Sequence, residues 1–143
     1  MKNKLTLLVL MLCTLLSAQK KKNGTIYIEH PAMDVVEQFN SAFVSGDVEK
    51  IKSLVSDDFS WRNSTMREKP GTLKQLLGRS NYLSNNIENF EIKHYGGSYP
   101  DAFEYKKDNV LDVKTYTWMT GYDKNTGVAL NMPRYANFRV QKN

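Results

Sequence analysis

Two neighbouring stretches in the first half of the chain place apolar residues three and four positions apart. The first begins after Pro31, and its apolar stripe consists of Ala32, Val35, Val36, Phe39, Ala42 and Phe43. The second follows the turn "SGD", and its stripe consists of Val48, Ile51, Leu54 and Val55. This spacing is typical of amphipathic helices, and Gly46 and Asp47 suit the end of one helix and the N-cap of the next. We therefore expect a helical hairpin from Pro31 to Val55.

The rest of the chain predicts one more helix and several strands. "TLKQ" resembles a capping box with Thr72 as the N-cap and Gln75 three residues on, followed by an apolar helix face. Strand patterns occupy 59–63, 88–95, 110–122 and 128–140, and the turn-rich stretch 96–109 leaves a further strand open. The turn "DKNTG" joins the last two strands, and Pro133 favours an edge position for the returning one. The order α-α-β-α-β-β-β predicts an α+β fold, with the helices packed on one face of a curved antiparallel sheet.

The N-terminal residues have the pattern of a signal peptide. "MKNK" is basic, and "LTLLVLMLCTLLSA" is an apolar run too short to span a bilayer comfortably. We expect cleavage after Ala18, so that 1–18 is the signal peptide, 19–30 a basic tail or lead-in, and 31–143 the domain. The protein would then be exported to the periplasm or the medium, with no stable membrane anchor. Cys13 would leave with the signal peptide, which excludes disulfides and cysteine chemistry in the mature protein.

Charge and histidine content exclude two further classes of site. The formal charge of the whole chain is +5, and removal of Lys2 and Lys4 would leave +3, which the cluster "KKK" at 20–22 accounts for. Such a cluster is typical of a solvated tail, so we expect no nucleic-acid partner. The two histidines, His30 and His94, lie far apart in sequence, and we therefore expect no metal site and no cofactor.

Two segments of the chain resemble nuclear transport factor 2-like, or SnoaL-like, domains. They are "VVEQFNSAFVSGDVEKIKSLVSDDFSWRN" and "TYTWMTGYDKNTGVALNMPRYANFRV", and the resemblance covers about residues 32–143. It implies a cone in which a bent sheet wraps a helix and encloses a pocket, while the outer sheet face often forms a homodimer. Members include isomerases, cyclases, dehydratases and non-catalytic binding modules, so fold does not fix function. Members commonly have another strand after the returning one, so we expect either a truncated product or a sheet that lacks its last strand.

The resemblance provides a test for ketosteroid isomerase chemistry. That mechanism needs an aspartate base, together with a tyrosine and a protonated aspartate as hydrogen-bond donors to the oxyanion. Alignment from the "SGD" turn and the "DDF" segment places the tyrosine position at Phe39, the base at Asn63 and the second aspartate at Ala136. Phe39 and Ala136 cannot donate, and an amide is a poor proton acceptor. The chain is therefore not expected to be a ketosteroid isomerase.

The returning strand and the strand of 88–95 each offer one candidate polar residue. If Ala136 faces the pocket, Met132, Arg134 and Phe138 share that face by alternation. Arg134 could bind a ligand carboxylate or phosphate, or it could lie in solvent or pair with an acidic neighbour. His94 shares a face with Phe90 and Ile92. It could act as a general base, because an imidazole changes charge near neutral pH, or it could be a hydrogen-bonded structural histidine.

The remaining candidates are aromatic side chains and one amide. Trp61 and Asn63 are expected to face the cavity, where Trp61 could stack on a ligand and Asn63 could form a hydrogen bond to it. Core packing is the alternative for Trp61. Phe39 and Phe138 are expected to line the apolar wall of the same pocket.

The strand "YTWMTGY" has no plainly polar face. Alternation places Thr115, Thr117 and Met119 on one side, which we expect to line or back the cavity. The other side, with Tyr116, Trp118 and Tyr122, is the expected homodimer surface. The alternative is that a β-bulge exchanges the two faces.

Three functions remain open on these grounds. The first is an exported module that binds a small apolar or aromatic ligand in the cone. The second is a small cofactor-independent isomerase, dehydratase or cyclase that uses His94, and the third is an interaction domain whose pocket is filled by its own side chains.

Overall fold

The computed structural model describes residues 23–63, 69–96, 99–107 and 110–141. The expected signal peptide lies outside the described residues, so cleavage after Ala18 stays a prediction. Within the described part of the chain, no helix is long and apolar enough to cross a membrane.

The sequence marks where each helix begins and where the first one ends. Helix α2, Pro31–Ser45, ends at Gly46, which adopts a left-handed conformation with φ 74°. Helix α3, Val48–Leu54, starts at Asp47, whose side chain accepts a hydrogen bond from the Lys50 amide at 2.9 Å. Helix α4, Leu73–Asn86, has the expected capping box. The predicted helical hairpin and the third helix are thus confirmed.

The strands form one antiparallel sheet with β4 at its centre. They are β1 Gly24–Tyr27, β2 Ile87–His94, β3 Asp101–Tyr105, β4 Leu111–Asp123 and β5 Ala129–Val140. One edge of β4 pairs with β3 in its first half and β2 in its second, while β5 pairs along the whole opposite edge. Strand β1 pairs with β3. In the described part of the chain β5 pairs with β4 alone, so Pro133 does lie in an edge strand.

Two segments differ from the sequence prediction. The expected strand 59–63 is reduced to a bridge, in which Trp61 and Gly71 exchange backbone hydrogen bonds of 3.2 and 2.7 Å. Pro70 has no amide hydrogen, so a longer ladder through this residue is disfavoured. The second difference is β1, a strand within the segment 19–30 that was expected to be a tail or lead-in.

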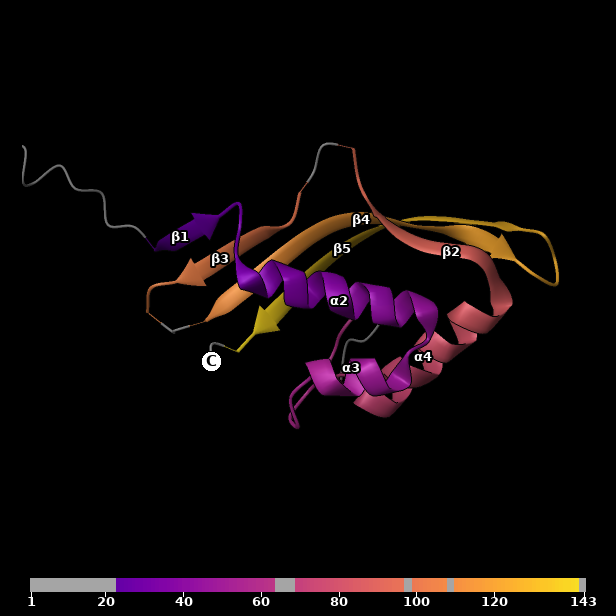
Figure 1. Ribbon diagram of the computed structural model, residues 1–143, viewed down its shortest axis with the longest axis horizontal. Helices are drawn as coiled ribbons and strands as arrows, with labels where there is room; N and C mark the ends of the chain where they lie inside the picture. Colours follow the sequence, from indigo (N-terminus) through magenta and orange to yellow (C-terminus); the bar gives the residue numbers. More distant parts are fainter. Residues whose placement is uncertain (1–22, 64–68, 97–98, 108–109, 142–143) are drawn as a thin grey trace, which may run out of the picture.

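The core lies between the helices and the inner face of the sheet, and it forms two clusters (Figure 1). The first consists of Phe39, Ala42, Phe43, Ile51, Leu76, Ile87, Phe90 and Met119. The second consists of Ala32, Met33, Val36, Ala102, Leu111 and Val113. Phe138 on β5 packs against both. These elements form the expected α+β arrangement, with helices covering one face of a curved antiparallel sheet.

Candidate functional site

A row of polar side chains crosses the inner face of the sheet. His94 at the end of β2 is paired with Thr117 on β4, and Thr117 is paired with Arg134 on β5. Directly paired residues project to the same face of a sheet, and Thr117 is buried on the helix side. The row therefore lies on the helix side of the sheet, where Thr117 is buried, Arg134 is half-buried and His94 is exposed.

Apolar rows flank these polar residues on the same strands. Met119 is paired with Met132 on one side of the row, and Val113 is paired with Phe138 on the other. The pair Thr115 and Ala136 lies between Val113 and Thr117. We call the row, together with Thr115 and the nearby Glu37 and Asn40 of α2, the polar belt. The belt separates the two apolar clusters of the core.

Arg134 is the cation of the belt. Its Nη1 donates to Asn40 Oδ1 at 3.2 Å, and its guanidinium carbon lies 5.5 Å from the centre of the Phe138 ring. The pKa of Arg134 is lowered to about 10, mainly by burial and to a smaller extent by repulsion from Arg79. Attraction to the Glu37 carboxylate raises the pKa and so opposes these two effects. The guanidinium stays protonated at neutral pH, so the belt holds a permanent, partly desolvated positive charge.

His94 contacts an acidic residue of α2. Its Nε2 lies 3.2 Å from Glu37 Oε1, and the two side chains are 36% and 46% exposed. That carboxylate oxygen is shielded from solvent and accepts no hydrogen bond from the described residues, because the contact with His94 lacks hydrogen-bond geometry. The pair is therefore close enough to adjust into a His–Glu hydrogen bond with a small movement.

The threonines of the belt differ in their hydrogen bonding. Thr117 Oγ1 donates to the Arg134 carbonyl oxygen at 3.4 Å. Thr115 is fully buried, and its hydroxyl has no hydrogen-bond partner among the described residues. A buried hydroxyl without a partner is uncommon in folded proteins and points to a missing partner such as water or a ligand.

Trp61 lies at the edge of the first cluster. It is half-buried, and its Nε1 donates to the Thr72 carbonyl oxygen at 3.1 Å. The guanidinium carbon of Arg79 on α4 lies 6.0 Å from the centre of the indole ring. Asn63, two residues further along the chain, is exposed. Trp61 thus has the hydrogen bond and the packing of a structural residue. Arg79, which lies over its ring, also repels the guanidinium of Arg134.

Phe39 and Phe138 occupy part of the interior beside the belt. Their rings form an edge-to-face pair with centroids 5.7 Å apart. Ala136 lies opposite Thr115 on the inner face. The structure thus brings Phe39, Phe138 and Arg134 together.

Sequence reasoning missed two residues of the belt, Glu37 and Asn40. Glu37 and Asn40 border the apolar stripe of α2 and are three residues apart, so they lie on the same side of the helix. Asn40 is buried with 5% exposure, which its polar side chain alone does not predict. Thr115 was assigned to the cavity side, but its unpartnered hydroxyl could be found only from the structure.

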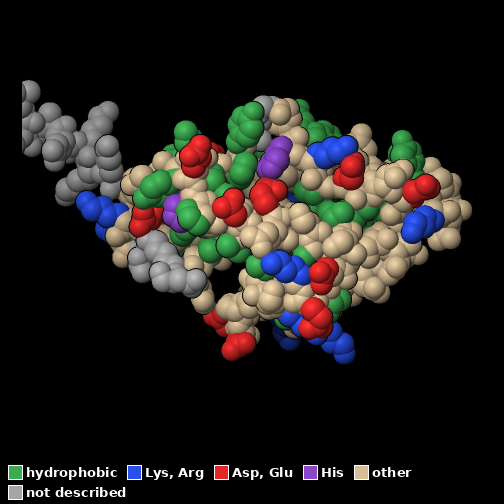
Figure 2. Space-filling model, in the orientation of Figure 1, with side chains coloured by type: hydrophobic (Ala, Val, Ile, Leu, Met, Phe, Trp, Pro, Cys, Tyr) green, Lys and Arg blue, Asp and Glu red, His purple; other side chains and the backbone are tan. Residues whose placement is uncertain are grey.

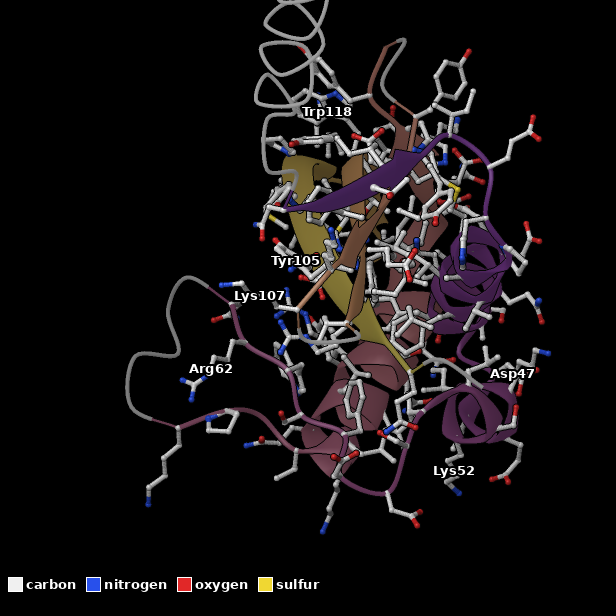
Figure 3. The ribbon with its side chains drawn as sticks, turned by 90° about the vertical axis from the view of Figure 1, so that its left-hand side faces the viewer. Asp47, Lys52, Arg62, Tyr105, Lys107 and Trp118 are labelled. Carbon is white, nitrogen blue, oxygen red and sulfur yellow. The ribbon has the colours of Figure 1, made fainter. Side chains whose placement is uncertain are left out.

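The outer face of the sheet carries the other residues that the sequence singled out. Tyr116 and Tyr122 are 44% and 52% exposed, and Trp118 is half-buried. Tyr95 lies beside Trp118 with ring centroids 5.6 Å apart, and Tyr116 beside Tyr135 at 5.1 Å. Figure 3 shows Trp118 on the side of the sheet away from α2. We call these five residues the outer aromatic patch.

A hollow lies apart from the belt, at the start of α2. It is an open surface depression of about 430 Å³ lined by Ile28, Glu29, His30, Pro31, Met33 and Asp34. In the described part of the chain, no group of three potential metal ligands comes together.

Comparisons with known proteins add one likeness. No family model and no curated protein matches the chain. Among solved structures, it is similar to a hypothetical protein with a ketosteroid isomerase-like fold from Catenulispora acidiphila DSM 44928, crystallised in complex with trimethylamine. The two are 14% identical, the match covers 75% of each chain, and the TM-score is 0.51. This likeness confirms the fold expected from the sequence: the chain has the ketosteroid isomerase-like cone, the fold of the nuclear transport factor 2-like and SnoaL-like proteins.

Proposed function

We propose that this is an exported domain that binds a small ligand with an apolar or aromatic body inside the cone, at the polar belt. The observation that carries the proposal is the fully buried Thr115 hydroxyl, which lacks a hydrogen-bond partner among the described residues. Leaving such a group unsatisfied costs about 1–3 kcal/mol, which a bound molecule with a polar group would recover.

The surroundings of the belt favour an apolar ligand body. Small-molecule sites are lined mainly by apolar side chains with a few polar groups that fix orientation. Here Phe39, Phe138 and Met119 flank the polar side chains. The similar protein from Catenulispora acidiphila was crystallised with the small molecule trimethylamine, so this fold can hold a small ligand.

A neutral aromatic probe tests the proposal. We would titrate 2-naphthylmethanol into ¹⁵N-labelled protein and follow the backbone amide signals. Shifts should be concentrated at Thr115, Thr117 and Arg134, with little change at Tyr122 on the outer face. Absence of shifts, or shifts confined to the outer aromatic patch, would contradict an interior site and favour an interaction domain whose cone is filled by its own side chains.

A second candidate function is a cofactor-independent isomerase, dehydratase or cyclase. The contact of 3.2 Å between His94 Nε2 and Glu37 Oε1 favours it, because a carboxylate can orient an imidazole as a general base. Arg134, two strands away in the same row, could stabilise negative charge that develops on the substrate.

Proton exchange separates this candidate from simple binding. With a bound carbon acid in D₂O, exchange at its acidic carbon should slow about 100-fold or more in His94→Gln, since general-base catalysis contributes this much. Arg62→Met, an exposed residue outside the belt, is the control. An unchanged exchange rate in His94→Gln would reject the enzymatic candidate and leave binding intact.

We also propose that the outer aromatic patch forms a homodimer. Tyr116, Trp118 and Tyr122 expose aromatic surface on a sheet face that no helix of the described chain covers. Light scattering of Trp118→Lys should show a monomer where the wild-type protein is a dimer. A dimer of unchanged stability in this variant would count against the patch as its interface.

Export is the last part of the proposal. The protein isolated from its host should begin at Gln19, as mass spectrometry of its N-terminus would reveal. An intact N-terminus at Met1 would contradict export by signal cleavage.

A further inference from the structure

We propose that the ligand of the cone interior is a carboxylate, held by the Arg134 guanidinium beside Asn40, with Arg79 contributing longer-range attraction. The inference rests on the proposed binding function and adds the charge of the ligand to it.

The charges around the belt do not balance. The guanidinium of Arg79 repels that of Arg134, and the carboxylate of Glu37 attracts it. Neither arginine forms an ion pair with any described residue, and the hydrogen-bond partner of Arg134 is the neutral amide oxygen of Asn40. Arg79 is exposed, whereas Arg134 is half-buried. A charge that is partly withdrawn from water is usually paired, and a bound anion would supply the ionic partner that Arg134 lacks among the described residues.

The geometry of Arg134 suits a carboxylate. A guanidinium has five N–H donors in a planar fork, which matches the two oxygens of a carboxylate. One of these N–H groups, on Nη1, donates to Asn40 Oδ1. Phe138 lies 5.5 Å from the guanidinium carbon, which places an apolar ring next to the charged group. An aromatic acid could therefore put its ring against Phe138 and its carboxylate on Arg134.

A buried donor in the next row supports the same ligand. The Thr115 hydroxyl, two residues before Thr117 on the same face of β4, has no partner among the described residues. It could donate to a carboxylate oxygen. This is an observation independent of the charge imbalance, and it too calls for an acceptor inside the cone.

Desolvation of Arg134 adds to the expected preference. Burial lowers its pKa to about 10, and repulsion from Arg79 contributes. A bound anion would offset both effects, whereas a bound cation would increase the repulsion. The face that α2 forms does not supply this selectivity, because acidic and basic side chains are interspersed over it (Figure 2).

Three probes of nearly equal shape test the charge of the ligand. They are 2-naphthoate, 2-naphthylmethanol and 2-naphthylmethylammonium, each titrated into the full-length mature protein at neutral pH. Naphthoate should bind about 10- to 100-fold more tightly than the alcohol, as expected for charge-assisted hydrogen bonds, and the ammonium should bind most weakly. Equal affinities of naphthoate and the alcohol would overturn the inference but leave the proposed function standing. Failure of all three to bind would count against both.

Substitutions then assign the preference to Arg134. Arg134→Met keeps the apolar stem and removes the charge, so it should weaken naphthoate binding about 10- to 100-fold and change binding of the alcohol less than threefold. Arg62→Met, also an arginine-to-methionine change but at an exposed position, is the matched control and should leave all three affinities unchanged. Arg134→Lys keeps the charge without the fork and should show an intermediate loss.

If Arg134→Met does not fold, the comparison of the three probes in the wild-type protein still tests the charge of the ligand, because it needs no substitution. If Arg134→Met weakens the acid and the alcohol equally, the arginine shapes the cavity and does not select an anion, and the inference is wrong.

Discussion

Replacement of Thr115 by valine should stabilise the ligand-free protein. The side chain of Thr115 is completely buried, and its hydroxyl finds no partner in the described part of the chain. Valine has nearly the same shape and replaces that hydroxyl by a methyl group. A buried hydroxyl without a hydrogen bond costs about 1–3 kcal/mol, so the free energy of unfolding should rise by about 1–2 kcal/mol in Thr115→Val. For a chain of this size the melting temperature should rise by about 3–8 °C.

Urea unfolding followed by tryptophan fluorescence measures this change, with the midpoint shifting at constant slope. Thr117→Val is the matched control, because the Thr117 hydroxyl donates to the Arg134 carbonyl oxygen at 3.4 Å. Loss of that bond should lower the free energy of unfolding by about 0.5–1 kcal/mol. A Thr115→Val variant less stable than the wild type would refute the reasoning, since it would mean that the hydroxyl already has a partner such as a buried water.

Three further predictions concern the elements that hold the site. Gly121→Ala should destabilise the protein by about 1–3 kcal/mol, because φ is 153° and a Cβ would lie 2.8 Å from the Glu88 carbonyl oxygen. Gly78 on α4 faces open space, so Gly78→Ala should instead raise the free energy of unfolding by about 0.5–1 kcal/mol in the same urea assay. Ser80→Ala should cost about 1–2 kcal/mol, since its buried hydroxyl donates to the Phe43 carbonyl oxygen at 2.7 Å, and an unchanged melting temperature would contradict this. Hydrogen bonds from Thr126 and Asn125 lower the pKa of Asp123, so its contribution to stability should be full above the ordinary pKa of an aspartate and be lost as the pH falls through the lowered value. Asp123→Ala should melt earlier than the wild type at pH 7, and the difference in melting temperature should shrink as the pH is lowered below the ordinary pKa of an aspartate.

The helices could be predicted because their signals are local. The stripe of α2, the glycine after it and the capping box of α4 each involve residues within one or two turns of one another. These signals indicate where a helix begins or ends before its packing against the rest of the chain is known, although packing of the apolar face supplies most of its stability. Sequence reasoning therefore placed these elements correctly.

The strand errors arise where a partner decides the outcome. "FSWRN" has a strand-like composition, yet the described chain offers it one paired residue, Gly71, and Pro70 disfavours a second. Conversely, Gly24–Tyr27 becomes a strand because β3 pairs with all four of its residues. A strand is stabilised by its neighbour, so composition alone cannot tell which short segment finds one.

The site was predicted in part for a similar reason. Alternation along β5 put Arg134 and Phe138 on one face, and the register of the sheet then brought His94 into the same row. Glu37 and Asn40 belong to a helix, and their place over that row depends on how α2 packs across the sheet. The sequence of α2 does not contain this information, so the charges that surround Arg134 could not be counted beforehand.

The two faces of β4 depend on one register. Tyr116 and Trp118 point outward while Thr115 and Thr117 point into the cone, and a shift by one residue would exchange them. The features that fix this register lie away from the belt. Asn89 adopts φ 51° at the bulge of β2, and Gly121 lets β4 approach the backbone of that bulge closely. Substitutions within the belt therefore change its chemistry without releasing the strand, whereas a substitution at Gly121 should disturb the interior site and the outer aromatic patch together.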